Sequence, residues 1–286
     1  MKPAPFGYVR PSSIEEALEA LREGGPGAKA LAGGQSLIPA LNFRLAQPSL
    51  LVDLAALDEL RGIRPLEDGG LAIGAMTRQR AVERSNLVRE RAPLVTETMA
   101  WVAHPQIRNR GTMGGSLAHA DPAAELPAVM LALDATFRLH GPAGSRRIPA
   151  REFYVGLFAT ALAPGELLAE IEIPAAHPGS RFALEEVSRR HGDFALAGVA
   201  VSLKPATDGT AEDIAIGLFS VGDRPILSEA GADVLRGRPL DARAIAGAAD
   251  ATADALDPPG DIHASPAYRR HLVRVLTRRA LQRVRA

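Results

Sequence analysis

The sequence predicts an α+β protein, and three features of its apolar pattern lead to this class. The chain opens with a strand–turn–helix–strand pattern that is complete within about 55 residues. It closes with three short strands followed by three helices. Between these parts lies the segment 174–179, where two prolines and a glycine interrupt any regular element.

The length and the position of this break predict the domain organisation. A chain of 286 residues is long enough for about two domains. Because segment 174–179 is the best boundary, we expect an N-terminal domain 1–176 and a C-terminal domain 177–286. The opening βαβ-like unit is too small to be stable alone, so we expect the first domain to comprise subdomains of about 1–55 and 56–176.

The first subdomain is predicted to begin with a helix after Ser13, because Glu16 follows three residues later, as in a capping box. The glycines of segment 24–27 end that helix. The elements that follow are a strand at 28–31, a turn at Gly33 and Gly34, a helix at 38–45 and a strand at 50–54.

The second subdomain alternates strands and helices. After a strand at 71–75, we expect Thr77 and Ser85 to be helix N-caps, and a helical stretch to continue from Pro93 to Trp101, whose ring belongs to the core. The remaining elements are a second glycine turn at 111–116, a helix at 123–133 capped by Asp121, and strands at 136–140, around Phe153 and at 167–173.

The C-terminal domain is predicted to start with three antiparallel strands, at 182–187, 195–203 and 214–221. Three helices follow, and the last runs from about Pro266 to Arg285. Its many arginines are typical of a solvated helix face. A nucleic-acid site is not expected, because 33 basic and 33 acidic residues leave the chain without net charge.

The composition excludes several kinds of chemistry. Without cysteine, the chain forms no disulfide, thiolate nucleophile, Cys-ligated zinc site or iron–sulfur cluster of its own. Any electron transfer through it therefore needs an organic cofactor. No run approaches the roughly 18 apolar residues of a membrane span, and residues 1–5 lead into no signal-like core. We expect a cytoplasmic chain with no transmembrane segment.

Two double-glycine turns carry the strongest functional signal: the first glycine turn (32–37) and the second glycine turn (111–116). Neither is a Walker loop or a Gly-x-Gly-x-x-Gly fingerprint. If the turns converge, they suit a diphosphate held by backbone N–H groups and by the hydroxyls of Ser36, Thr112 and Ser116. Glycine patterning by itself also fits turns with a purely structural role.

The tract from His119 to Glu125 contains one histidine and two carboxylates. Its spacing matches no standard zinc or two-metal site, so we expect a polar network and no metal. Glu125 lies one turn into the predicted helix and could accept hydrogen bonds from a polyol.

Four motifs occur in order: Ala32-Gly33-Gly34-Gln35-Ser36-Leu37, Pro105-Gln106-Ile107-Arg108-Asn109-Arg110-Gly111-Thr112-Met113-Gly114-Gly115-Ser116, Gly192-Asp193-Phe194-Ala195 and Tyr268-Arg269-Arg270. Together they resemble the FAD-binding medium subunits of the molybdenum hydroxylases. This group includes carbon monoxide dehydrogenase, quinoline oxidoreductase and the xanthine dehydrogenase flavin domain. The resemblance spans nearly the whole chain.

The resemblance implies an FAD-binding fold of the vanillyl-alcohol-oxidase (PCMH) type in two subdomains, followed by a flavin-covering α+β domain with a small antiparallel sheet. Residues 32–36 and 112–116 would hold the FAD diphosphate, Leu37 and Phe194 would flank the isoalloxazine, and Glu125 would face the ribityl chain. The implied cofactor-binding residues are Ala32, Gly33, Gly34, Gln35, Ser36, Leu37, Thr112, Met113, Gly114, Gly115, Ser116, Glu125 and Phe194. No residue is assigned a catalytic role.

The resemblance also implies a division of labour in a heteromeric enzyme. A large subunit would hold the molybdenum cofactor, a small subunit would hold two-iron two-sulfur clusters, and this chain's FAD would pass electrons to an external acceptor. We expect the FAD to be non-covalent, because the chain has no cysteine for a thioether link.

Two alternatives differ in function. One is a self-sufficient flavin oxidoreductase that acts on its own organic substrate, although no base or nucleophile accompanies Phe194 in the sequence. The other is a cofactor-free assembly factor that kept the fold. Flavin absorption bands would exclude the assembly factor, and turnover without molybdenum would favour the self-sufficient enzyme.

Overall fold

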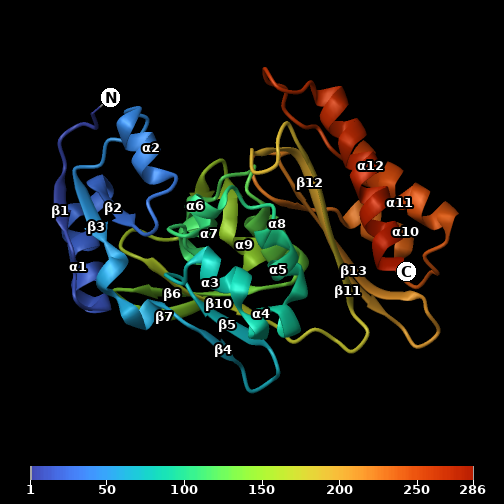
Figure 1. Cartoon of the computed structure of the whole chain (residues 1–286), viewed down its shortest axis with the longest axis horizontal. Helices are drawn as coiled ribbons and strands as arrows, with labels where there is room; N and C mark the ends of the chain where they lie inside the picture. Colours follow the sequence, from blue (N-terminus) through green and yellow to red (C-terminus); the bar gives the residue numbers. More distant parts are fainter. Residues whose placement is uncertain (1, 286) are drawn as a thin grey trace.

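The structure is a computed structural model that describes residues 2–285. Figure 1 shows three blocks in sequence order: an N-terminal block in blue, a middle block in green and a C-terminal block in yellow to red. Helices and mostly antiparallel sheets alternate within the blocks, which confirms the α+β class.

The N-terminal block is built on a three-stranded sheet of order β1-β3-β2. Its elements are β1 (Gly7–Val9), α1 (Ile14–Gly24), β2 (Ala28–Leu31), α2 (Leu37–Asn42) and β3 (Leu50–Asp53), with 3₁₀ turns at Gly25–Gly27, Leu54–Ala56 and Asp58–Leu60. Strands β2 and β3 are parallel, as the βαβ prediction requires. Strand β1 was not predicted, and it pairs in parallel with the other edge of β3.

The two helices of this block differ slightly from prediction. The hydroxyl of Ser13 accepts from the N–H of Glu16 at 3.2 Å, as in a capping box, but the Glu16 carboxylate accepts from Ser12, one residue earlier, at 2.8 Å. Helix α2 ends at Asn42, before the expected end at 45, and Arg44 beyond it has a left-handed φ of 57°. A left-handed residue cannot continue a right-handed helix.

The middle block contains a five-stranded antiparallel sheet of order β4-β5-β10-β6-β7. Its strands are β4 (Ile63–Pro65), β5 (Leu71–Gly74), β6 (Thr136–Gly141), β7 (Gly144–Pro149) and β10 (Leu167–Ile173), and β8 (Tyr154–Gly156) pairs with β9 (Ala159–Thr160). Its helices are α3 (Gln79–Arg84), α4 (Asn86–Arg91), α5 (Pro93–Met99), α6 (Pro105–Arg108), α7 (Met113–His119), α8 (Glu125–Ala132) and α9 (Ala150–Phe153).

Of four local predictions in this block, one is confirmed, two are wrong and one is displaced by a residue. Ser85 caps α4 as predicted. Thr77 caps no helix, because its hydroxyl bonds the N–H and C=O of Gly62, both at 3.0 Å. Asp121 caps a turn ahead of α8 and does not cap the helix itself. Phe153 itself ends the short helix α9, and the strand expected around it, β8, begins at the next residue, Tyr154.

The C-terminal block has a four-stranded antiparallel sheet of order β11-β12-β13-β14. Its elements are β11 (Arg181–Ser188), β12 (Ala195–Pro205), β13 (Ala211–Phe219), β14 (Ile226–Leu227), α10 (Glu229–Leu235), α11 (Ala242–Asp254) and α12 (Pro266–Arg285). The three predicted strands and the three helices are confirmed, with α12 at the predicted bounds.

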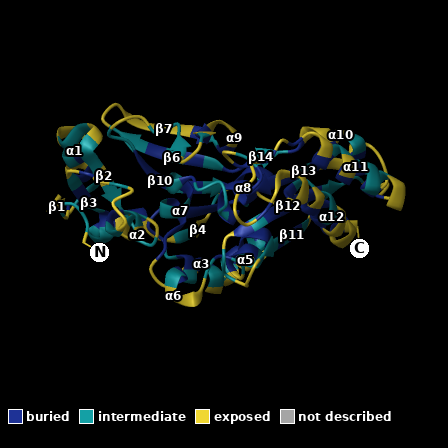
Figure 2. Ribbon diagram, turned by 90° about the horizontal axis from the view of Figure 1, so that it is seen from above, coloured by how far each residue is buried: buried dark blue, intermediate teal, exposed yellow. Residues whose placement is uncertain are grey.

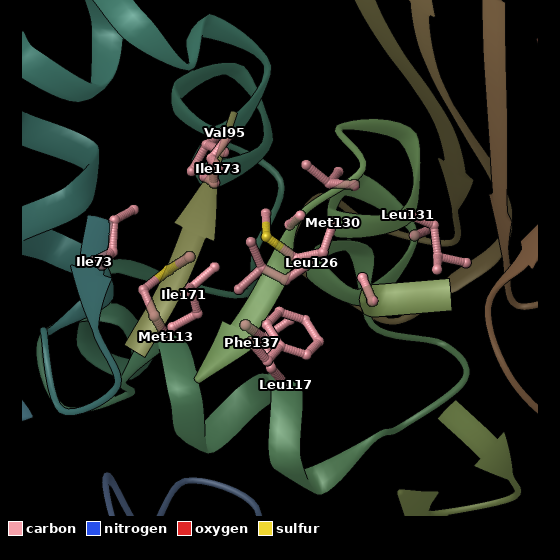
Figure 3. Packing of buried hydrophobic residues seen from close by; sticks show 14 of the residues in the cluster. Ile73, Val95, Met113, Leu117, Leu126, Met130, Leu131, Phe137, Ile171 and Ile173 are labelled. Atoms are coloured by element: carbon pink, nitrogen blue, oxygen red, sulfur yellow. The ribbon is translucent and has the colours of Figure 1, made fainter. Parts of the chain in front are cut away.

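The largest hydrophobic cluster lies in the middle block and extends into the C-terminal sheet. Figure 3 shows its centre, where Phe137 of β6 packs among Met113 and Leu117 of α7 and neighbouring apolar side chains. Leu184 and Phe219 of the C-terminal sheet belong to the same cluster. The other face of that sheet packs on α12, so buried residues form a continuous band across both blocks (Figure 2).

Candidate functional site

The two glycine turns are in direct contact. Gly33 lies so close to the second turn that an added Cβ would be 2.5 Å from the carbonyl oxygen of Arg110 and 2.8 Å from Cα of Gly111. An added Cβ at Gly115 would be 3.2 Å from Cβ of Ala32. The glycines are therefore needed for the two backbones to approach each other. The convergence that a shared ligand requires is present.

The first turn keeps several backbone donors available. Gly34 has a left-handed φ of 73°, which reverses the chain between β2 and α2. Within residues 2–285, the N–H groups of Gly34, Gln35 and Ser36 donate to no acceptor. Successive free N–H groups in such a turn form a concave site for an anion.

The second turn is held firmly by the rest of the middle block. Its N–H groups donate within the chain: Met113 to the Thr77 carbonyl at 3.0 Å, Gly114 to the Ala75 carbonyl at 2.8 Å, and Gly115 and Ser116 to the Thr112 hydroxyl and carbonyl at 3.1 and 3.2 Å. The side chain of Met113 is fully buried in the central cluster. The half-buried hydroxyl of Ser116 is then the best-placed donor that this turn offers to a ligand.

A cavity of about 470 Å³ lies beside the first turn. It is lined by Leu31, Ala32, Gly33, Gly34, Gln35, Ile38, Pro39, Asp53, Ala55, Arg78, Ile107 and Arg110. Burial lowers the pKa of Arg78, and the positive charges of Arg61 and Arg110 lower it further. The guanidinium of Arg78 also donates to the carbonyl of Arg110. An excess of positive charge at a cavity rim favours an anionic ligand.

From the sequence alone no role was assigned to Arg78 or Arg110, although Arg110 belongs to the motif at residues 105–116. A single arginine gives no pattern in a sequence with 33 basic residues. The pairing of Arg78 with the residue before the second turn depends on the fold, because the two lie 32 residues apart.

Glu125 and Phe194 do not line this cavity. Glu125 is the first residue of α8 and is 6% exposed, and its burial raises its pKa to about 7. Phe194 precedes β12 and is 66% exposed. Ser220 joins their two segments, because its N–H donates to the carbonyl of Pro122 at 2.7 Å and its hydroxyl donates to the carbonyl of Ala195. The structure therefore places these two residues on adjacent segments.

Glu186 on β11 is a second buried acid near Glu125. Its side chain is 8% exposed, and neither carboxylate oxygen has a hydrogen-bond partner within residues 2–285. Burial raises the pKa of Glu186 to about 8, and the charge of Glu125 contributes to the increase. A buried carboxyl group without partners is costly in its charged form.

This raised pKa predicts a dependence of stability on pH. The folded state holds the Glu186 proton up to about pH 8, whereas the unfolded chain releases it near the ordinary pKa of about 4.5. The contribution to stability is complete below that lower value and is lost as pH rises through about 8. Glu186→Gln needs no proton, so its melting temperature is expected to fall less between pH 5 and 9 and to exceed that of the parent by about 3–6 °C at pH 9.

Calorimetry or circular dichroism across this pH range tests the prediction. Glu90→Gln is the matched control, because Glu90 is exposed at the surface of α4 and its side chain makes no hydrogen bond in the part of the chain described. If the difference in melting temperature between the parent and Glu186→Gln is the same at every pH, the folded state does not hold a proton on Glu186.

Neither a metal-binding cluster nor a membrane-spanning helix is found within residues 2–285. The side chains of His, Asp and Glu form no group of three or more that could hold a metal ion. Among the helices of this range, none combines the length and the apolar character needed to cross a bilayer.

The chain is similar to known flavoprotein subunits along its whole length. Residues 4–176 match the family described as FAD binding domain in molybdopterin dehydrogenase, and residues 182–284 match the CO dehydrogenase flavoprotein C-terminal domain. The alpha subunit of the 6-hydroxypseudooxynicotine dehydrogenase complex of Paenarthrobacter nicotinovorans is 44% identical, over 98% of this chain and 95% of that protein.

Carbon monoxide dehydrogenases are similar in sequence and in structure. The medium chain from Afipia carboxidovorans is 42% identical, over 100% of this chain and 99% of that one. The solved carbon monoxide dehydrogenase from Hydrogenophaga pseudoflava superimposes with a TM-score of 0.97 at 38% identity, over 99% of this chain and 98% of that one.

The fold and the paired turns thus define a flavoprotein whose FAD-binding part is followed by a smaller α+β part. The chain belongs to the family of FAD-binding medium subunits of the molybdenum hydroxylases. It is an FAD-carrying electron-transfer subunit of a heteromeric oxidoreductase, and the molybdenum and iron–sulfur centres belong to other subunits of such complexes. This assignment is favoured over a self-sufficient flavin enzyme.

Proposed function

We propose that the FAD diphosphate binds in the cavity beside the first glycine turn. The observation that carries this proposal is the contact of the two turns next to a cavity bordered by Arg78 and Arg110. The free N–H groups of Gly34, Gln35 and Ser36 would donate to phosphate oxygens. The two arginines would compensate the negative charge. Donors, charge and space therefore fit a dinucleotide diphosphate.

The other predicted residues have four roles in this proposal. Thr112, Met113, Gly114 and Gly115 fix the second turn against the first, and Ser116 and Ala32 border the ligand. Leu37 and Phe194 would flank the isoalloxazine, and Glu125 would face the ribityl chain. In its protonated form, which the pKa of about 7 makes accessible near neutral pH, Glu125 can also donate a hydrogen bond to a hydroxyl.

We further propose that residues 1–176 bind the cofactor, with subdomains of about 1–55 and 56–176, and that residues 177–286 cover the flavin. The separate sheets of the three blocks support this division. Bound FAD supplies a redox group that accepts electrons from an iron–sulfur partner and yields them to an external acceptor. The residues of this chain bind and orient it.

We place the protein in the cytoplasm, and fractionation of the producing cells tests that location.

The flavin is expected to be bound without a covalent link. No cysteine is available for a thioether bond. Acid precipitation of the FAD-loaded protein should leave essentially all of the flavin absorbance in the supernatant. Yellow colour that remains in the washed pellet would contradict this expectation. Turnover of a simple organic donor by the chain alone would favour the self-sufficient enzyme.

Phe194→Ala is expected to change the flavin without releasing it. If the ring of Phe194 packs on the isoalloxazine, its removal exposes the flavin to water and shifts the reduction potential by about 10–30 mV. FAD affinity should change little, because the diphosphate contacts remain. Redox titration and the absorption spectrum measure the effect, with Ile262→Ala as the control, since Ile262 is an exposed apolar residue (94% exposed) outside both glycine turns.

A further inference from the structure

The turn that carries Phe194 rests on a loop of the middle block. We call residues 188–194 the β11–β12 turn and residues 101–104 the shelf. The rings of Trp101 and His191 are stacked, with centroids 5.5 Å apart and an interplanar angle of 27°. Trp101 packs at the rim of the central cluster and is half-buried, so the expectation that it lies inside the core is only partly met.

A second contact joins the same two segments. Gly192 has a left-handed φ of 88°, and an added Cβ would lie 2.5 Å from the ring of His104 and 3.1 Å from the carbonyl oxygen of Ala103. The turn therefore packs directly against the shelf at Gly192, where both the left-handed φ and the lack of space for a Cβ require glycine.

The shelf itself is rigidly held by a buried arginine. Arg108, which is 5% exposed, donates to the carbonyls of Val102 at 2.8 Å and Ala103 at 3.0 Å. Its guanidinium also forms a two-pronged pair with Glu83, at 3.0 and 3.1 Å. These bonds stabilise the left-handed conformation of Ala103, whose φ is 45°. Arg108 belongs to the motif around the second glycine turn, but no ligand role accounts for it.

We propose that Trp101, His104 and His191 are positioning residues that seat the β11–β12 turn and thereby fix the ring of Phe194 beside the flavin. The flavin part of this inference rests on the function proposed above. Phe194 is 66% exposed, so its own packing does little to fix it, whereas Ala195 after it is 4% exposed and anchored in the core. On the N-terminal side of Phe194, the chain is fixed by the contacts of His191 and Gly192 with the shelf.

The seating can be tested without flavin, by limited trypsin digestion of the full chain. Arg189 and Arg190 are exposed within the β11–β12 turn, so trypsin can cleave there once the turn leaves the shelf. His191→Ala is expected to accelerate cleavage after these arginines by about three- to tenfold, which mass spectrometry of the fragments measures. His191 is exposed, so the variant should fold normally. His263→Ala, an exposed histidine of the loop before α12, is the control.

Fluorescence gives an independent check of the same contact. Trp101 is the only tryptophan of the chain, so the tryptophan emission of the flavin-free protein reports on the surroundings of this one ring. His191→Ala should shift the emission spectrum, and His263→Ala should not. An unchanged emission together with an unchanged cleavage rate would overturn the inference.

The coupling to Phe194 is tested in the FAD-loaded complex. His191→Ala and Phe194→Ala should each alter the flavin absorption spectrum, and the double variant should resemble Phe194→Ala, because the histidine acts through that ring. Strictly additive effects would mean that the turn does not act through Phe194. If Phe194→Ala leaves the flavin unchanged while His191→Ala still accelerates cleavage, the seating stands and the proposed flavin contact fails.

Discussion

Gly33→Ala is expected to lower the affinity for FAD by at least about 100-fold, which corresponds to roughly 3 kcal/mol. The added methyl group would overlap the backbone of Arg110 and Gly111 at 2.5 and 2.8 Å. Backbone atoms cannot rotate away as a side chain can, so the two glycine turns would have to separate. Separation would move the free N–H groups of the first turn away from Arg78 and Arg110. The diphosphate could then no longer contact the N–H groups and the two arginines at the same time.

The measurement is a titration of the flavin-free protein with FAD, together with a melting curve that shows the variant to be folded. Gly247→Ala is the matched control. Gly247 lies on α11, and an added Cβ would meet Cγ1 of Val234 on α10 at an ordinary distance of 3.5 Å. If Gly33→Ala were to bind FAD as tightly as the parent does, the contact between the turns would be structural only and the proposed site would be wrong.

The second large effect is expected for Arg269→Met. Arg269 is 6% exposed and donates to the carbonyls of Leu196 and Ser220, the latter at 2.8 Å, and to the carboxylate of Asp261 at 2.6 Å. Its removal leaves the carbonyl groups of Leu196 and Ser220 without this partner, at about 1–3 kcal/mol for each. We expect the melting temperature to fall by about 10 °C.

The position of Arg269 gives this variant a second readout. One of the carbonyls that it binds is that of Leu196, two residues after Phe194, and the other is that of Ser220, whose hydroxyl donates to the carbonyl of Ala195, so the flavin spectrum should change as well. Arg278→Met is the control on the same helix, because Arg278 is exposed and its side chain makes no hydrogen bond within residues 2–285. Equal melting temperatures for the two variants would show that the buried contacts of Arg269 add little.

The elements with a strong apolar pattern could be predicted from the sequence. Strand β3 and helix α12 follow from runs of apolar residues at the periods of strand and helix, and their bounds agree closely with prediction. Strand β7 has no such pattern, because four of its six residues are exposed. It forms a hairpin with β6, and its Arg147 also reaches Glu172 of β10 at 2.9 Å, a contact between residues distant in the sequence.

In the candidate site too, features that depend on neighbouring residues could be predicted, and features that depend on residues distant in the sequence could not. The glycine turns could be found because a double glycine at a strand-to-helix corner is a local signal. The arginines at the cavity and the shelf under the β11–β12 turn could not, because each depends on contacts made by the folded chain. Thr77 illustrates the opposite error, since a residue that looks like a helix cap is used to bond Gly62.

The C-terminal sheet, which is covered on both faces, also determines how a cofactor could be exchanged. A hinge motion of this block would have to pull side chains such as Leu184 and Phe219 out of the central cluster, at roughly 1.5–3 kcal/mol for each large apolar side chain exposed. A displacement of the β11–β12 turn exposes far less apolar surface. Flavin entry and release are therefore expected to proceed through local loop opening, while the blocks themselves keep a fixed relative orientation.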